Sequence, residues 1–455
     1  MTKRSVLTNL PLLALAAFCI AATLPFTMYD QGDFARMVSR VVGSPLGASS
    51  EFPAMQWEHS AGIPVPNPSS GLASVLFWLA ALVQRMLFDH FSLIAWGLAI
   101  KVLMAIAVLV LAHALADRRK HEVWAHLGFG VGLMLVAFAP HNSAFFQTFY
   151  PEQIALVALP LLCATLVGRF QGRAVLFTVG LMALAWTKTQ YFYVPILALG
   201  ILCIHKGARP MPIKALVLLC AVTQVIAILP IVRSAYSETN RYNATYFGSY
   251  LALDPDERAD LRLSAKQLAC VGTDWWGNRI ESPIDVEAET TNVSCGEILK
   301  ASQKDVASPF LHHPMVLMTM VADTVRAHWT TGYFHIDKDN RYLRVDPRRD
   351  GPTTKFMLGL DRLVSMLASP IAVLILLLSV PLLTARIGRQ SRWVGACGFL
   401  AWFIVSQLVV SLLGDGFRDL SKHLALMLFA SELLVFVTLA AWLGNQSKES
   451  AEPTV

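Results

Sequence analysis

The sequence predicts an all-α polytopic membrane protein. Of its 455 residues, 55% are hydrophobic and 15% are charged, and the mean hydropathy is +0.52. Soluble domains carry about 25% charged residues. Much of the chain consists of apolar stretches, several near the roughly 20 residues that a helix needs to cross a bilayer. The basic residues gather in short segments between these stretches, so a bundle of transmembrane helices accounts for all three observations.

Hydropathy predicts about ten transmembrane helices joined by polar loops. The candidate spans are 6–28, 93–114, 124–140, 154–167, 174–186, 191–205, 213–232, 360–384, 394–413 and 424–443. Basic clusters fall at MTKR, ADRRKH, GRFQGR, HKGARPMPIK and ARIGRQSR. With the N-terminus inside, this number of spans places every cluster in the cytoplasm, as the positive-inside rule requires. We therefore expect a multi-pass protein of the inner (cytoplasmic) membrane with both termini cytoplasmic.

Two apolar segments need separate interpretation. If 71–88 also crossed the membrane, the later basic loops would lie outside, so we interpret it as a re-entrant or interfacial helix. A true span is the alternative. Residues 6–28 are longer than the apolar core of a signal peptide and precede no clear A-x-A site, so they are interpreted as an uncleaved first helix.

The polar segments divide the chain into four parts. Residues 1–232 form an N-terminal transmembrane module with a first outer loop, 29–89. Residues 233–355 form an extracytoplasmic loop domain, and 356–444 supply the C-terminal transmembrane helices. Residues 445–455 are expected to be a cytoplasmic polar tail.

Two of the seven cysteines, Cys270 and Cys295, lie in the outer domain, whereas the other five lie in apolar helices. An oxidising compartment favours a disulfide between an outward pair, which would staple a small domain. The sequons at Asn243 and Asn292 matter only in a host that glycosylates. No cysteine and histidine spacing indicates a metal site.

Several function classes are not indicated. The sequence has no Walker A motif, no GxGxxG after a strand, no HExxH and no GxSxG. The formal net charge of +6 is explained by the cytoplasmic basic loops and requires no nucleic-acid partner. Functional chemistry is therefore sought among the polar residues beside helix ends.

The first outer loop begins with MYDQGDFARM, in which Asp30 and Asp33 lie three residues apart. If this segment continues as a short helix, the two carboxylates share a face. Two like charges this close raise the pKa of one carboxyl group, which suits a catalytic base. The alternative is that Asp30 caps a helix and Asp33 is an acid of its first turn.

Two further charged residues lie at the same predicted side of the membrane. Glu152, in TFYPEQ, begins the span 154–167, where it is either functional or an acid matched to the helix dipole. Lys188, in WTKTQYF, lies outside against the positive-inside trend and suits a phosphate. Its alternative role is to snorkel to the membrane surface.

The segment GDGFRDLSKHL precedes the last span. It places Asp415, Arg418 and Lys422 on one helical face, with Asp419 and His423 beside them. Three cationic or protonatable side chains next to the outer membrane face indicate an anion site. The alternative is a self-neutralising face of weak salt bridges.

Together, the first span followed by YDQGDFAR, the outer FYPEQ, AWTKTQYFYVPIL and GDGFRDLSKHL resemble the GT-C fold of polytopic glycosyltransferases that use polyprenyl-phosphate-linked sugars. The resemblance is closest to bacterial surface-glycan hexose transferases. The resemblance in topology extends over nearly the whole chain, and the motifs that carry it are short. It implies a hexosyltransferase of cell-envelope polysaccharide biosynthesis that works at the bilayer on a polyprenyl-phosphate-linked sugar and a glycan or lipid-linked acceptor.

The resemblance also assigns roles to residues. It implies that Asp33 is the catalytic base, with Asp30 as its neighbour. Many relatives have adjacent acids instead of Asp-Gln-Gly-Asp, which leaves open which carboxylate is the base. The donor phosphate would be held by basic residues at outer helix ends: Lys188, Arg418, Lys422 and His423. Glu152 and Asp415 are additional candidates.

The implied reaction is one inverting displacement, in which an acceptor hydroxyl attacks the anomeric carbon and polyprenyl phosphate departs. Trp275, Trp276 and Tyr333 offer aromatic faces for sugar rings, although core packing is the commoner use of tryptophan. No cofactor beyond the lipid-linked donor is implied, and the participation of a divalent metal stays open.

Two rival functions stay open. A transporter or flippase for a lipid-linked glycan would use the same charges to line a pathway, but the sequence shows no obvious inverted repeat. A glycan polymerase or ligase would share the chemistry with a larger donor.

Overall fold

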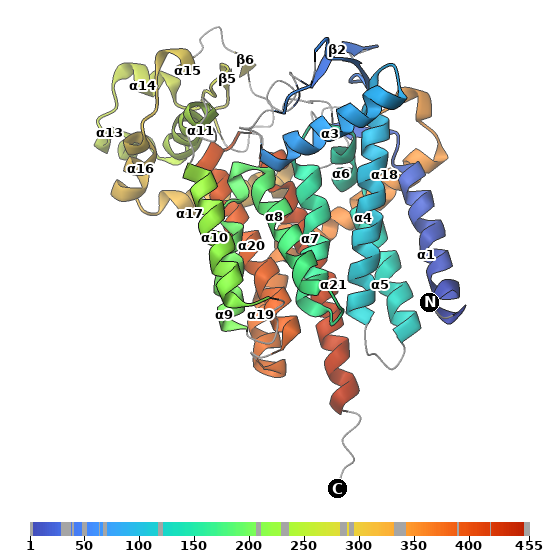
Figure 1. The fold of residues 1–455 in the computed structure, drawn as a ribbon. Coiled ribbons are helices and arrows are strands. Elements are labelled where there is room, and N and C mark those ends of the chain that lie inside the picture. Colours follow the sequence, from blue (N-terminus) through green and yellow to red (C-terminus); the bar gives the residue numbers. More distant parts are fainter. Residues whose placement is uncertain are drawn as a thin grey trace. The chain divides into compact units, whose positions relative to one another are not determined.

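The computed structural model describes residues 3–28, 38, 41–47, 52–62, 64–66, 71–116, 122–205, 211–228, 236–282, 289–290, 295–331, 343–388, 391–418 and 420–449. The chain is mostly helical (Figure 1). It divides into two compact units, each treated separately below. Unit 1 comprises 1–227, 336–403 and 428–455, and unit 2 comprises 228–335 and 404–427.

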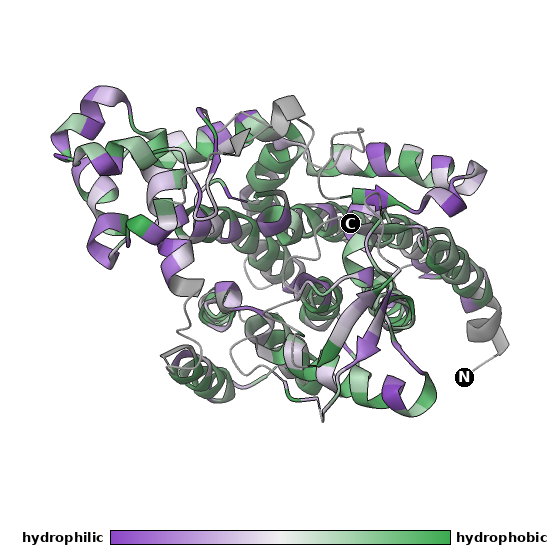
Figure 2. Cartoon of the chain, turned by 90° about the horizontal axis from the view of Figure 1, so that it is seen from above, coloured by the Kyte–Doolittle hydropathy of each residue, from purple (hydrophilic) through white to green (hydrophobic). Residues whose placement is uncertain are grey.

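Unit 1 is built on a bundle of apolar helices. In its N-terminal part these are α1 (Lys3–Ala22), α4 (Leu93–Ala116), α5 (Glu122–Ala137), α7 (Glu152–Val167), α8 (Arg173–Thr187), α9 (Val194–Ile204) and α10 (Ile213–Ile228). α4 packs on α5 and α7, and α7 packs on α8. The helices seen end-on in Figure 2 are hydrophobic along most of their length. Such all-round hydrophobicity is typical of helices that lie in a core or a membrane.

The C-terminal helices are α18 (Pro352–Ser365), α19 (Pro370–Ile387), α20 (Arg392–Asp415) and α21 (Leu420–Glu449). The predicted span 360–384 starts too early, because α18 ends at Ser365 and the candidate span α19 begins at Pro370. Ser369 accepts a hydrogen bond from the backbone N–H of Ala372 and so caps α19. The proline that follows has no N–H to donate to the preceding turn, so a new helix starts there.

Four described helices are long and apolar enough to cross a membrane: α4, α19, α20 and the Lys422–Leu443 part of α21. α5 and the residues 140–147 form a pair bent by 61° that would make a fifth span. The remaining apolar helical segments of the described chain, which include Asn9–Ala22 of α1, have 10–17 residues. The protein is therefore a membrane protein with several apolar helices, and the predicted number of about ten spans is not confirmed.

A small sheet and a helix lie in the first predicted outer loop, 29–89, and the residues directly after it. β2 (Val42–Leu46), β3 (Gln56–His59) and β4 (Phe91–Ser92) pair antiparallel in that order. α3 (Gly71–Leu87) packs on α8, and Figure 1 shows it lying across α4, α7 and α8 rather than parallel to them. Its exposed side chains are largely apolar, and they include Leu79, Val83, Met86 and Leu87. This orientation agrees with the interfacial interpretation of 71–88.

The chain leaves α1 through a short strand that is firmly held. β1 (Phe26–Met28) pairs antiparallel with β7 (Leu343–Val345). Gln147, at the end of η2 (Ala144–Gln147), donates to the carbonyl oxygen of Phe26 at 2.8 Å, and Thr27 donates back to Gln147 O at 3.0 Å. These bonds fix the point where the segment that carries Asp30 and Asp33 begins, although both aspartates lie outside the described residues.

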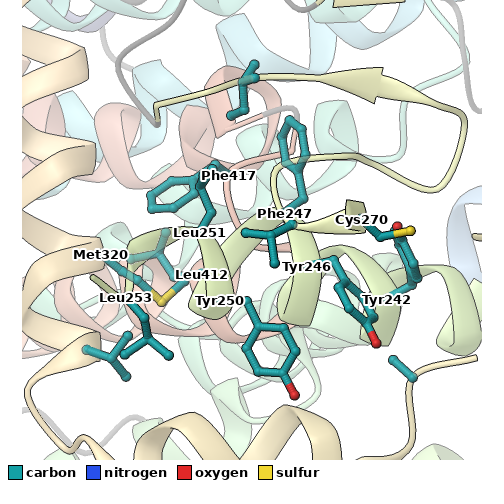
Figure 3. Packing of buried hydrophobic residues seen from close by; sticks show 14 of the residues in the cluster. Tyr242, Tyr246, Phe247, Tyr250, Leu251, Leu253, Cys270, Met320, Leu412 and Phe417 are labelled. Carbon is teal, nitrogen blue, oxygen red and sulfur yellow. The ribbon is translucent and has the colours of Figure 1, made fainter. Parts of the chain in front are cut away.

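Unit 2 is a helical domain with a predominantly apolar and aromatic core. Its helices include α11 (Tyr236–Ala244), the π-helix η5 (Thr245–Ser249), α12 (Tyr250–Ala252), α13 (Pro255–Asp260), α14 (Ala265–Cys270), α15 (Cys295–Ile298), α16 (Gln303–His312) and α17 (Val316–Thr331). β5 (Asn278–Arg279) pairs with β6 (Glu289–Thr290). Tyr242, Tyr246 and Tyr250 line one side of the core (Figure 3). The ring centroids of Tyr242 and Tyr246 lie 4.8 Å apart, and those of Tyr246 and Tyr250 lie 5.3 Å apart. Cys270 and Cys295 form a disulfide across 25 residues.

The predicted domain 233–355 overlaps unit 2, but its last residues, 336–355, belong to unit 1. Unit 2 also contains 404–427, the end of α20 and the start of α21. Leu412, Phe417, Leu420 and Leu424 are buried in the tyrosine core of the unit. Hydropathy could not separate these residues from a transmembrane helix, because their packing partners lie far away in the sequence.

Candidate functional site

In unit 1, the structure brings Glu152 and Lys188 together. Glu152 is the first residue of α7, and Lys188 follows directly on α8. Since α7 packs against α8, the beginning of one helix lies beside the end of the other. Lys188 Nζ donates to Glu152 Oε1 at 2.8 Å, and the two side chains are 10% and 0% exposed. An ion pair is therefore buried among apolar helices, where the desolvation of both charges is costly.

Only one oxygen of the Glu152 carboxylate has a hydrogen-bond partner among the described residues. Its Oε2 is buried and makes no hydrogen bond with any described residue. The adjacent Gln153, in contrast, donates to the carbonyl oxygens of Thr148 and Tyr150 and accepts from the indole of Trp96. The backbone before α7 is thus held by Gln153, while Glu152 keeps a buried acceptor available. A buried polar atom without a partner is unusual and indicates a functional or strained position.

In unit 2, Arg418 forms an ion pair with Asp274. Arg418 Nη1 lies 2.6 Å from Asp274 Oδ2, and the guanidinium lies over the ring of Trp276, 5.1 Å from its centroid. Asp274 is fully buried and also accepts from the backbone N–H groups of Trp276 and Asn278 and from the Asn278 side chain. Arg418 therefore neutralises a structural carboxylate of the domain.

Asp415 and His423 form a second pair in unit 2. His423 Nε2 lies 3.0 Å from Asp415 Oδ2, and Asn243 donates to Asp415 Oδ1 at 2.8 Å. Asn243 also accepts from the backbone N–H of Trp275. Asn243 is fully buried, so this sequon is not exposed for glycosylation. Lys422 is 9% exposed, and Asp419 lies outside the described residues.

The loop between α20 and α21 approaches α11 and η5 very closely. Gly416 has φ +61°, and a Cβ there would lie 2.7 Å from the carbonyl oxygen of Asn243 and 2.8 Å from Gly248 Cα. The N–H of Phe417 donates to the carbonyl oxygen of Phe247 at 3.2 Å. Only glycine allows both the backbone conformation and this contact. The GDGF part of the motif therefore has a structural role, which sequence reasoning did not assign to it.

Trp275 and Trp276 have different environments. Trp275 is partly buried and packs against Gly296 and the ring of Tyr242. Trp276 is exposed and rests on Arg418. Burial raises the pKa of Tyr242, with further contributions from Tyr246 and Asp274, so this phenol stays protonated at neutral pH. Tyr333 lies outside the described residues.

The predicted site residues thus fall into separate groups. Glu152 and Lys188 are partners in unit 1, whereas Asp415, Arg418, Lys422 and His423 belong to unit 2. Among the residues that the structure describes, no group of three or more His, Cys, Asp and Glu side chains is arranged to hold a metal ion.

Sequence reasoning missed a buried polar network in unit 1. His141 lies between Asp361 of α18 and Glu432 of α21, and Asn142 donates to Glu432. One signal was present in the sequence, because Glu432 is an acid within the otherwise apolar stretch 424–443. Ionisable residues at such positions are costly and tend to be functional.

The apolar helices and their buried charges define an integral membrane protein. A family model described as the YfdI N-terminal transmembrane domain matches residues 3–453, so the chain belongs to this family. The uncharacterized protein YfdI of Escherichia coli (strain K12) is 25% identical over 302 residues, which is 64% of this chain and 64% of that protein. The chain thus spans less than two thirds of the length of this relative. No solved structure matches.

Proposed function

We propose that this protein is a glycosyltransferase of the GT-C type that transfers a sugar from a polyprenyl-phosphate-linked donor to a cell-surface glycan or lipid-linked acceptor, on the outer face of the inner membrane. The observation that carries the proposal is the buried Glu152–Lys188 pair, 2.8 Å apart, at the ends of two apolar helices. An ammonium at this position suits a phosphate whose lipid chain lies in the bilayer, because a cation there can stabilise the departing charge.

The contacts rank the proposed phosphate ligands. Lys188 comes first, because its ammonium lies at the end of an apolar helix, where the phosphate of a lipid-linked donor would reach it. Arg418 comes last, since it neutralises the buried Asp274. Lys422 and His423 stand between them. Asp415 is bound by both His423 and Asn243, which favours a structural role over a catalytic one.

In the proposed reaction an acceptor hydroxyl attacks the anomeric carbon of the donor sugar. A carboxylate takes the hydroxyl proton, a role that we assign to Asp33 with Asp30 as its neighbour. The bond between the anomeric carbon and the phosphate oxygen breaks, and its electron pair leaves with the polyprenyl phosphate. One displacement inverts the anomeric centre. No further acid is needed, because the phosphate is already a good leaving group.

The direct test is sugar transfer by the purified protein in nanodiscs, with a polyprenyl-phosphate hexose as donor and lipid-linked glycan from the native envelope as acceptor. Asp33→Asn keeps the side-chain volume but cannot take the proton, so turnover should fall by roughly 10²- to 10⁴-fold. Asp30→Asn is the matched control and should retain most of the activity. An inactive Asp30→Asn with an active Asp33→Asn would exchange the two roles. Full activity in both variants would remove this carboxylate pair from the reaction.

Transport of a lipid-linked glycan is the alternative that a specific observation favours. His141, Asp361 and Glu432 are buried together, and such groups mark proton pathways in many membrane transporters. This alternative predicts translocation of a fluorescent lipid-linked glycan in proteoliposomes without any change in the glycan. Transfer of the hexose to an acceptor would decide against it. A polymerase or ligase would instead transfer a preassembled oligosaccharide in the same assay.

A further inference from the structure

The buried network around His141 has unusually complete geometry. His141 Nδ1 lies 2.7 Å from Asp361 Oδ1, and Nε2 lies 2.8 Å from Glu432 Oε1. The backbone N–H of His141 also donates to Asp361 Oδ1 at 2.8 Å. Asn142 donates to Glu432 Oε2 at 2.8 Å and to the carbonyl oxygen of Val136 at 3.0 Å. The four polar residues are between 0% and 3% exposed.

This geometry fixes the number of protons that the network holds. Each ring nitrogen faces a carboxylate oxygen within hydrogen-bond distance, so a hydrogen must lie between the atoms of each pair. A neutral imidazole carries a single N–H. The second contact therefore requires one additional proton, either on the ring or on a carboxyl group. The three groups therefore share this proton.

Without that proton, a nitrogen lone pair would face a buried carboxylate. Among the described residues, His141 is the one basic side chain within ion-pair distance of Asp361 or Glu432. The other titratable side chains of α5 and α18, and those in the first turn of α21, are exposed or lie near a helix end: Lys355, Arg362, Glu122, His126, Lys422 and His423. β1 and η2, which also pack on α6 (Pro140–Ser143), contain no charged residue.

The network joins three distant parts of the chain. His141 and Asn142 belong to α6 (Pro140–Ser143), which is followed by η2 and then by Glu152 at the start of α7. Asp361 lies on α18, and Glu432 lies midway along the apolar span Lys422–Leu443 of α21. The contacts therefore fasten the short helix that precedes the Glu152–Lys188 pair.

We propose that His141, Asp361 and Glu432 form a proton-binding site inside the membrane part of the protein, and that the bound proton holds α6 against α18 and α21. The ligand is a proton shared by one imidazole and two carboxylates. Loss of the proton releases α6. This inference does not depend on glycosyl transfer, because it concerns the packing of unit 1 and is measured without a substrate.

The network predicts that two conservative substitutions behave differently. In Glu432→Gln, the amide nitrogen can donate to His141 Nε2 while the amide oxygen accepts from Asn142, so every contact is kept with a neutral ring and no additional proton. In Asp361→Asn, the amide oxygen accepts from Nδ1–H, but Nε2 still faces Glu432. This variant therefore still requires the additional proton and is the matched control.

The test is hydrogen exchange of the full chain in nanodiscs, followed by mass spectrometry of peptides that cover α6 and η2. Above about pH 6.5 an imidazole that is released from the network is neutral, so the opening of α6 releases one proton. The equilibrium constant for this opening therefore rises by up to tenfold per pH unit. The exchange rate of the wild type relative to Glu432→Gln at the same pH should rise by up to about tenfold per unit. Asp361→Asn should show the same rise as the wild type.

The proposal would be overturned if the exchange rate of the wild type, divided by that of Glu432→Gln, stayed constant with pH. A constant ratio of Asp361→Asn to Glu432→Gln would also overturn it. If Glu432→Gln does not fold, peptides from α9 in the same wild-type sample provide the reference, because Val194–Ile204 contains no acidic, basic or histidine residue. Equal pH dependence of α6 and α9 would then exclude the proton site.

Discussion

Replacement of Lys188 by methionine should destabilise the folded protein, whether or not a substrate is present. Lys188 is the only hydrogen-bond partner of Glu152 Oε1 among the described residues, and Oε2 has none. Lys188→Met therefore leaves a buried carboxylate without a counter-charge. Breaking a buried ion pair in this way costs about 3–5 kcal/mol. Since 1.4 kcal/mol is a factor of ten, the unfolding equilibrium should shift by roughly 10²- to 10⁴-fold.

The double variant Glu152→Met/Lys188→Met separates this effect from binding. Because apolar side chains of similar volume often replace a buried pair without loss, the double variant should unfold within about 1 kcal/mol of the wild type. Equilibrium unfolding in micelles, followed by circular dichroism, measures both variants. A single Lys188→Met variant as stable as the wild type would refute the reasoning. The stable double variant then tests whether Lys188 binds the donor, which should be lost with the charge.

Three further predictions follow from the described contacts. Gly416→Ala should destabilise unit 2 by about 2 kcal/mol, because residue 416 has a positive φ and its Cβ would lie 2.7 Å from a carbonyl oxygen; unfolding of the variant measures this. Reduction of Cys270–Cys295, whose loop spans 25 residues, should cost about 3 kcal/mol, measured by unfolding with and without reductant. In a background without exposed native thiols, Gly414→Cys should react with an impermeant thiol reagent in intact cells and Lys214→Cys only after lysis; the reverse pattern would invert the proposed topology.

The sequence was sufficient to predict features that depend on local composition. Apolar stretches located most helices, since a helix surrounded by lipid must be apolar on most of its surface. The break between α18 and α19 was missed, although Ser369 and Pro370 form a helix start. The apolar residues around it obscured that signal. The disulfide was predicted because Cys270 and Cys295 lie together in the polar loop, where an oxidising compartment favours a bond between them.

The sequence was not sufficient where a role depends on a distant partner. Arg418 was predicted to hold a phosphate, but Asp274, which neutralises it, lies more than a hundred residues away. His141 was not selected at all, since its partners are separated from it by 220 and 291 residues. Spacing within a helix reports which side chains share a face, but it carries no information about what packs against that face.

The ion pairs Arg418–Asp274 and Lys188–Glu152 differ in how well their carboxylates are satisfied. Asp274 accepts hydrogen bonds from two backbone N–H groups, an amide and Arg418, so the charge is stabilised where it lies and fixes the fold of unit 2. Glu152 has one partner and one unsatisfied oxygen. A pair that is costly to bury and incompletely bonded contributes little to stability, so its presence in an apolar bundle is better explained by what it binds. A substrate site in this protein should therefore be sought first around Glu152 and Lys188 in unit 1.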